Sequence, residues 1–149
     1  GVLNSFGNSA KLGKSNWCLI ESDESDGSFL KIPFTYSIIT NIDAEHLDFY
    51  KSLENLKKNF SSFIEKTPSL GKTFLCIDDK NIKKLKNKIA TKNILTYGFS
   101  SLSDYQITKP QYNQKNCKFD LVVKNFLGKK ITIKNIKIML FTCPYYLLL

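Results

Sequence analysis

Two short acidic segments carry the residue types best suited to chemistry. The first, E-S-D-E-S-D at residues 21–26, places Glu21, Asp23, Glu24 and Asp26 within one turn-sized stretch. Carboxylates this close repel one another unless a cation or protons offset their charge. Oxygen ligands of this kind are what Mg²⁺ takes when it also binds substrate phosphates. From this run alone, a solvated surface turn is the favoured interpretation.

The second segment makes a metal-binding site the better interpretation of the two segments together. N-I-D-A-E-H-L-D at residues 41–48 contains the one histidine of the sequence, His46, between Glu45 and Asp48. An imidazole there can ligate a metal or orient a phosphate, with a nearby carboxylate fixing its tautomer. Two acidic segments, one of which holds the sole histidine, therefore predict a metal-binding site.

Composition argues against a polyanionic partner. The 149 residues carry a net charge of +9, and all 22 basic residues are lysine. Nucleic-acid recognition favours the arginine fork, whereas lysine, asparagine and isoleucine share A/T-rich codons, so a biased genome explains the charge better. The charge is also uneven: residues 1–50 hold three lysines against seven acids, and residues 105–149 hold eight against one. We expect chemistry in the acidic third and no nucleic-acid binding.

The broad class follows from the same numbers. With 42% hydrophobic and 23% charged residues, the chain has a globular balance and the length of one domain. It lacks an apolar stretch of the roughly 20 residues that span a bilayer, and it opens on no leader pattern. A cytoplasmic protein without membrane contact is the expectation. The four cysteines are far apart, so we expect reduced thiols, with Cys18 and Cys76 buried in apolar runs.

The elements that must position the acidic segments follow from periodicity. Short apolar runs predict strands over residues 17–20, 36–40, 73–77 and 93–97. The acidic segments come directly after the first two, at the edge where open α/β sheets bind ligands.

Helices are predicted between the later strands. Residues 52–66 place apolar side chains at helical spacing (Leu53, Leu56, Phe60, Phe63 and Ile64). Asp79 is expected to cap a shorter helix with Ile82, Leu85 and Ile89 on one face. This alternation predicts an α/β fold, a mostly parallel sheet with flanking helices, over residues 1–100.

The residue pattern changes after the fourth predicted strand. Residues 105–108, 118–124 and 130–134 alternate in character between turn residues and predict a meander of antiparallel strands, which makes residues 101–138 a β extension. The last segment, residues 139–149, is almost entirely apolar up to its final residue. Such an end is typical of a truncated or frame-shifted reading frame rather than of a domain boundary.

Two Gly-Lys-Ser/Thr triplets, at residues 13–15 and 71–73, resemble part of a phosphate-binding loop. A true loop needs another glycine five positions before the one that precedes the lysine, so that backbone N–H groups wrap the phosphates. Asn8 and Lys66 occupy that position for Gly13 and Gly71 respectively. Both triplets are interpreted as turns.

The quoted residues together resemble the central ATPase domain of the Mur ligases. The resemblance rests on C-L-I-E-S-D-E-S-D-G-S-F-L (18–30) and I-I-T-N-I-D-A-E-H-L-D-F-Y (38–50), with E-N-L-K-K-N-F (54–60), C-I-D-D (76–79) and T-Y-G-F-S (96–100) in support. It covers roughly residues 1–138, including the opening G-V-L-N-S-F-G-N-S-A-K-L-G. The fold it implies is the P-loop-NTPase-like central domain of that family.

The resemblance also implies roles for individual residues. Glu21 matches the glutamate that holds Mg²⁺ at the γ-phosphate of ATP, and His46 matches the histidine that holds a second Mg²⁺ near the acceptor carboxylate. Asp23, Glu24 and Asn41 match positions expected to contact substrate. Glu45 stands where the family usually has aspartate, a conservative departure.

The implied reaction is ATP-dependent joining of L-alanine to UDP-N-acetylmuramate through an acyl phosphate, in peptidoglycan precursor synthesis. The family's phosphate loop and amino-acid-binding domain are missing from these residues, so a fragment that is inactive alone is expected. Three alternatives remain open: a recycling ligase that attaches a whole tripeptide, a degenerate product without catalysis, and a lysine-rich nucleic-acid module. The sequence around residues 21–26 and 40–46 favours the alanine reaction over the tripeptide one.

Overall fold

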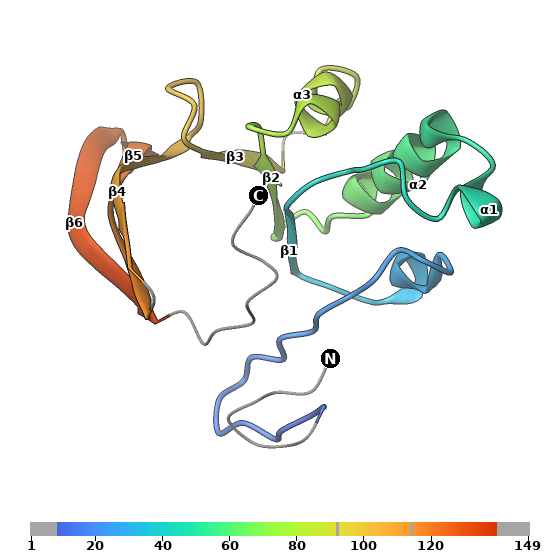
Figure 1. Ribbon diagram of the computed structural model, residues 1–149, viewed down its shortest axis with the longest axis horizontal. Helices are drawn as coiled ribbons and strands as arrows, with labels where there is room; N and C mark the ends of the chain where they lie inside the picture. The colour runs from blue at the N-terminus through green and yellow to red at the C-terminus, as the bar shows by residue number, and fades with distance from the viewer. Residues whose placement is uncertain (1–8, 92, 114, 140–149) are drawn as a thin grey trace.

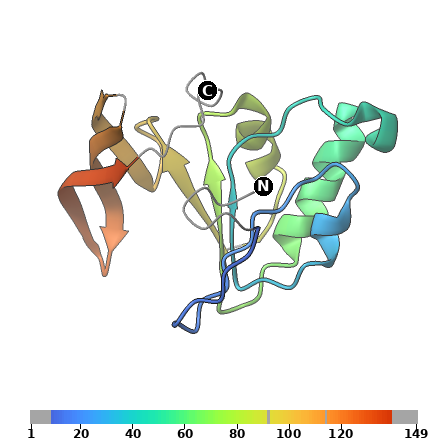
Figure 2. The ribbon, with the colours of Figure 1, turned by 60° about the horizontal axis from the view of Figure 1, so that its bottom comes forward.

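A six-stranded sheet in the order β1-β2-β3-β4-β5-β6 organises the chain. The computed structural model describes residues 9–91, 93–113 and 115–139. Strands β1 to β4 run parallel to one another, and β4 to β6 run antiparallel (Figures 1 and 2). The strands are β1 (Tyr36–Ile39), β2 (Lys72–Cys76), β3 (Ile94–Gly98), β4 (Tyr105–Tyr112), β5 (Asn116–Phe126) and β6 (Lys129–Met139). The predicted fold class, a mostly parallel sheet with flanking helices and an antiparallel β extension, is confirmed.

The longest helix, α2 (Leu53–Glu65), forms where the apolar spacing predicts it. The Ser52 hydroxyl accepts a hydrogen bond from the Asn55 N–H at 3.1 Å and so caps the helix start. Leu56, Phe60 and Ile64 recur every four residues on one face, and all three are buried. The remaining helices are α1 (Leu47–Tyr50), α3 (Lys80–Lys86) and a 3₁₀ turn, η1 (Ser28–Lys31).

The hydrophobic core lies between the parallel strands and these helices. Figure 1 shows α1, α2 and α3 gathered beside β1 and β2, away from the antiparallel strands. Leu75 of β2 is fully buried there, and Ile39 of β1 packs in the same cluster. The cluster is completed by side chains of the helices and of the loops that enter them, namely Phe29, Ile42, Tyr50, Leu56, Phe60, Ile64, Ile82 and Leu85. The core therefore fixes the loops that follow β1 and β2.

The antiparallel part is continuous with the parallel part of the sheet. Its first strand, β4, pairs parallel with β3 over two positions, Tyr97 with Tyr105 and Gly98 with Gln106. The connecting loop is held against β3 by the Asp104 carboxylate, which accepts hydrogen bonds from the Thr96 N–H at 2.8 Å and from the Thr96 hydroxyl at 2.6 Å. The predicted meander is therefore confirmed for β4, β5 and β6 among themselves, and β4 makes it continuous with the parallel strands.

The strand predicted over residues 17–20 is wrong. These residues have no regular secondary structure, and Trp17 and Leu19 are 72% and 96% exposed. Cys18 is exposed as well, which corrects its expected burial, and Cys76 is half-buried. An apolar run records a preference for burial, but a strand also needs a hydrogen-bonded neighbour and an apolar cover. In the described ranges, the Trp17 ring meets the Tyr36 ring at 5.5 Å, and no ladder joins this segment to the sheet.

The triplet at Gly71 is a turn, as predicted. The Gly71 N–H donates to the Pro68 carbonyl at 2.9 Å, and a Cβ at this position would come within 2.0 Å of the Thr35 carbonyl oxygen. Glycine is therefore required for the close approach of two backbones, not for phosphate binding. The triplet at Gly13 lies in exposed irregular chain. The apolar segment over residues 140–149 lies outside the described residues, as does the opening of the chain up to residue 8.

Within the described ranges, no helix combines the length and the apolar character needed to cross a bilayer.

Candidate functional site

The first acidic segment folds as a tight, solvated turn. The Asp23 carboxylate accepts a hydrogen bond from the Ser25 N–H at 2.6 Å, and Asp26 accepts one from the Ser28 N–H at 2.8 Å. Hydrogen bonds from the Ser25 and Ser28 side chains, together with these backbone hydrogen bonds, lower the pKa of the Asp23 and Asp26 carboxyl groups, and the nearby charge of His46 lowers the pKa of Asp23 further. The turn therefore presents negative charge at neutral pH on the side that faces His46.

A glycine allows the backbone conformation with which this turn ends. Gly27 has φ +71°, and a Cβ there would lie 3.2 Å from the Phe49 ring of α1. A larger residue would meet both backbone strain and that ring. The glycine in E-S-D-E-S-D-G therefore lets the acidic turn pack against the helix that follows His46.

The second acidic segment begins where β1 ends. His46 stands immediately before α1, and its backbone adopts the left-handed conformation with φ 53°. Its carbonyl accepts hydrogen bonds from the N–H groups of Phe49 and Tyr50, both at 3.0 Å. The single helical turn of α1 therefore fixes the backbone of the histidine.

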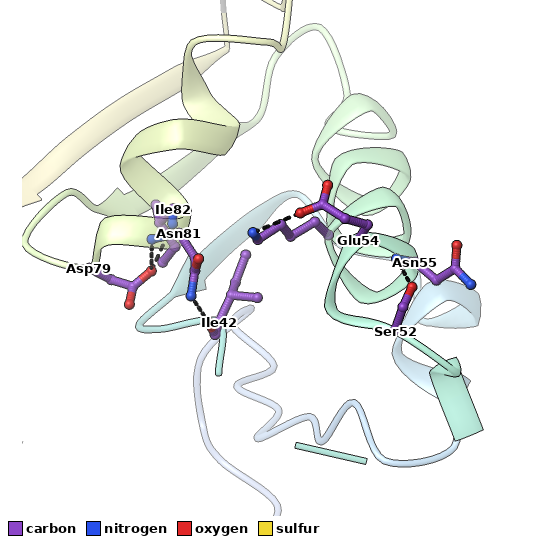
Figure 3. A network of polar contacts seen from close by, with 8 residues as sticks. Ile42, Ser52, Glu54, Asn55, Asp79, Asn81 and Ile82 are labelled. Carbon is purple, nitrogen blue, oxygen red and sulfur yellow. Dashed lines mark hydrogen bonds and ion pairs between the residues drawn. The ribbon is translucent and has the colours of Figure 1, made fainter. Parts of the chain in front are cut away.

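A second contact holds the start of this segment to helix α3. The Asn81 side-chain amide donates to the Ile42 carbonyl at 2.7 Å, and both residues are buried (Figure 3). Asn81 is itself positioned by the Asp79 carboxylate, which accepts hydrogen bonds from the N–H groups of Asn81 and Ile82 and caps α3. The loop after β1 is thus tied to the first turn of α3, the helix that follows β2.

Within the described part of the chain, the structure brings together one group of side chains able to hold a metal ion. It consists of Glu24 from the first acidic segment and Glu45 and His46 from the second. One possible ligand atom from each residue lies within 4.8 Å of the other two. Glu24 and His46 are half-buried, and Glu45 is exposed.

The other predicted site residues lie around this group and not in it. Glu21 and Asn41 are exposed and are not members of the group of three. Asp23 faces it closely enough for the His46 charge to affect its pKa. The metal roles of Glu21 and His46 and the substrate roles of Asp23, Glu24 and Asn41 remain predictions.

The donor set fits a hard divalent cation. Mg²⁺ and Mn²⁺ take carboxylate oxygens at about 2.1 Å and keep several waters, so two carboxylates and one imidazole can share one ion without enclosing it. Ligand atoms around such an ion are about 3–4 Å apart, slightly less than the 4.8 Å limit within which these atoms lie. A small side-chain adjustment is enough to bring Glu24, Glu45 and His46 onto a single cation.

Sequence reasoning missed the residues that support this group. Tyr50 and Asn81 are buried, and their side chains donate hydrogen bonds to the backbone carbonyls of Glu24 and Ile42 in the two acidic segments. Asp78, in the C-I-D-D motif, accepts hydrogen bonds from the N–H groups of Phe99 and Ser100 and holds the loop after β3. Asp78 could have been identified from the sequence, because it is a polar residue directly after a predicted strand. The residues around Tyr50 in the sequence give no such indication.

A mixed sheet with helices packed against its parallel strands is an open α/β fold, the kind that binds ligands at the carboxyl ends of its strands. The sequence profile of the Mur ligase middle domain matches residues 13–140. The chain belongs to this family.

The chain is also similar to curated family members. It is 53% identical over 141 residues to the UDP-N-acetylmuramate–L-alanine ligase of Pelagibacter ubique (strain HTCC1062), a match that covers 94% of this chain and 30% of that protein. It is 36% identical to the same ligase of Caulobacter sp. (strain K31), over 92% of this chain and 29% of that protein. The chain therefore spans about 30% of the length of these relatives.

Among solved structures, the chain is similar to MurF from Acinetobacter baumannii, with a TM-score of 0.55 and 14% sequence identity. The match covers 77% of this chain and 24% of that one. At this identity the likeness supports the fold alone.

Proposed function

We propose that this chain is the central part of an ATP-dependent ligase that joins L-alanine to UDP-N-acetylmuramate in peptidoglycan precursor synthesis. One observation carries the proposal: the chain is 53% identical, over 94% of its length, to a relative named for that reaction. The identity is high enough to favour the same substrates over those of the tripeptide-recycling alternative. Because the chain spans 30% of that relative, the proposed activity belongs to the longer protein.

The acidic edge of the sheet suits the proposed chemistry. In this reaction ATP phosphorylates the acceptor carboxylate of UDP-N-acetylmuramate, and the amine of L-alanine then attacks the acyl phosphate and displaces phosphate. Mg²⁺, when bound, supplies positive charge that offsets the negative charge of the transferring phosphoryl group. Such charge compensation in a positioned site is a large part of catalysis by phosphoryl-transfer enzymes.

The residues of this chain would hold the cation and the anionic groups in place. We assign Glu21 and His46 as metal ligands, with Glu24 and Glu45 close enough to His46 to share its ion. Asp23 and Asn41 are assigned to substrate contact. The carboxylates of Asp23 and Asp26 keep a low pKa through hydrogen bonds from Ser25 and Ser28, so the turn stays anionic at neutral pH.

ATP, UDP-N-acetylmuramate and L-alanine are the proposed ligands, and Mg²⁺ is the proposed metal. We place the reaction in the bacterial cytoplasm, where ATP is supplied.

A chimaeric enzyme tests this function. Residues 13–140, the part that the family profile covers, replace the matching segment of the Pelagibacter relative. We expect ADP release that requires both UDP-N-acetylmuramate and L-alanine. A chimaera that releases no ADP with both substrates present, while the unaltered relative does, would contradict the proposal.

The same chimaera tests the metal assignments. Glu21→Ala and His46→Ala should each lower acyl-phosphate formation by about a hundredfold or more, because each removes charge compensation from the transferring phosphoryl group. Glu65→Ala, an exposed acid at the end of α2, is the matched control and should leave the rate unchanged. Full activity in either site variant would refute its metal role.

A further inference from the structure

Tyr50 occupies an unusual position for a polar aromatic residue. It ends α1, four residues after His46, and its side chain is only 4% exposed within the hydrophobic core. The ring lies edge-on to the Phe49 ring, with centroids 4.8 Å apart. Burying a hydroxyl costs free energy unless it forms a hydrogen bond, so the partner of this hydroxyl matters.

That partner is the acidic turn. The Tyr50 hydroxyl donates a hydrogen bond to the backbone carbonyl of Glu24, twenty-six residues earlier in the chain. The same carbonyl accepts the Gly27 N–H at 3.0 Å, the bond that closes the turn. The hydroxyl is therefore the link between the closed turn and the helix that carries His46.

The other end of the link is equally well fixed. The Tyr50 N–H donates to the His46 carbonyl at 3.0 Å, and the Tyr50 carbonyl accepts a hydrogen bond from the Asn55 side chain at 3.0 Å. Asn55 belongs to the first turn of α2, the helix with the largest share of the core. One residue thus connects the backbone of Glu24, the backbone of His46 and a rigid helix.

We propose that Tyr50 is a positioning residue whose hydroxyl holds the acidic turn against the His46 loop, so that Glu24 and His46 can bind the same divalent cation. This inference rests on the proposed function, because it requires that Glu24, Glu45 and His46 bind a metal. Tyr50 itself does not touch the ion. It acts through the backbone of Glu24.

Tyr50→Phe removes the hydroxyl and keeps the buried ring. The probe is Mn²⁺ alone, titrated into the 149-residue chain and followed by the electron paramagnetic resonance signal of the unbound ion. Losing one hydrogen bond that orders the site should weaken Mn²⁺ binding about three- to tenfold. Tyr112→Phe, which removes an exposed hydroxyl from β4, is the matched control and should leave the affinity unchanged.

Amide hydrogen exchange separates positioning from general stability. If Tyr50 positions the turn, Tyr50→Phe speeds exchange at the Gly27 amide, which closes the turn, and leaves exchange at Leu75 in the core strand β2 unchanged. Equal acceleration at both amides would mean a general structural role and would overturn the proposal.

Two further variants separate this inference from the proposed metal site. Glu24→Gln and His46→Ala must weaken Mn²⁺ binding if the site exists. Should they do so while Tyr50→Phe binds Mn²⁺ as tightly as the unaltered chain, the positioning role is refuted and the site stands. Should neither ligand variant affect binding, or should the unaltered chain not bind Mn²⁺, the metal site fails and the role of Tyr50 fails with it.

Discussion

The parallel and antiparallel halves of the sheet are stabilised in different ways. The parallel half, β1 to β3 with its helices, contains the hydrophobic cluster around Leu75, Leu56 and Ile64. In the antiparallel half, β4 to β6, Val123 is the one hydrophobic side chain among the described residues that is buried. Long ladders of backbone hydrogen bonds join β5 to β4 and to β6 instead. The functional candidates lie on the half with the core.

Charge divides the halves in the same way. Residues 105–149 contain eight lysines and one acid, Asp120. That acid is used structurally, since it accepts a hydrogen bond from the Asn135 N–H at 2.9 Å and lies 3.6 Å from the Lys109 ammonium group. Lysines along β6, an edge strand, discourage pairing with another chain. The antiparallel half, β4 to β6, is therefore a largely solvent-exposed sheet, called the ribbon below. The parallel half provides a rigid base that can hold the acidic loops in fixed positions.

The largest expected effect comes from the core. Leu75→Ala should lower the free energy of unfolding by about 2–5 kcal/mol, because Leu75 is fully buried and its truncation leaves a cavity. Ile133→Ala in β6, where the side chain is 47% exposed, should cost less than about 1 kcal/mol. Urea unfolding of both variants measures the difference. Similar costs at the two positions would show that the ribbon has a core of its own.

An intermediate effect is expected at high pH. Burial, with help from the neighbouring Cys76, raises the pKa of Tyr97 from 10.0 to about 12. The folded state then binds the phenol proton more tightly than the unfolded state, so the stabilisation is complete below pH 10 and is lost as the pH rises to about 12.

Tyr97→Phe should abolish that part of the pH dependence, which amounts to about 1–2 kcal/mol after allowance for solvent screening. Comparing urea unfolding of the two proteins between pH 9 and 12 isolates it from the titration of the lysines. Tyr112→Phe in the ribbon serves as the control. Parallel pH curves for the unaltered protein and Tyr97→Phe would contradict the account.

The smallest effect concerns a helix cap. Asp79→Ala removes the acceptor for the N–H groups of Asn81 and Ile82 and should cost about 1 kcal/mol. Asp26→Ala, which removes an acceptor from a solvated turn, should cost less than about 0.5 kcal/mol. Thermal unfolding measures both. Equal losses would mean that the acceptor in the solvated turn contributes as much to stability as the cap of α3.

The sequence predicted the parallel half well because its signals are local. Helix α2 follows from the spacing of Leu53, Leu56 and Phe60, and Asp79 marks the start of α3. Strands β1, β2 and β3 lie within a residue or so of their predicted limits. The segment over residues 17–20 failed because its burial depends on a covering partner, which hydrophobicity does not report.

The candidate site was predicted in part. Residue types pointed to both acidic segments, although the strand expected before the first one is absent, and the structure places Glu24 beside Glu45 and His46. Which carboxylate of the first segment meets the histidine depends on the turn at Gly27 and on the bond from Tyr50 to the Glu24 carbonyl. The Tyr50 contact joins residues far apart in the sequence, so the sequence alone did not show that Glu24 lies beside His46; the assignments of Glu21 to the metal and of Glu24 to substrate stay predictions.

The central claim is that the two acidic loops of the parallel half form one divalent-cation site. Substoichiometric Mn²⁺ added to the ¹⁵N-labelled chain tests it most directly, because a bound Mn²⁺ broadens the resonances of nearby amides. The account predicts broadening centred on Glu24, Glu45 and His46, and its loss in His46→Ala. Broadening centred on Asp78 and Asp79, or spread evenly over the chain, would contradict it.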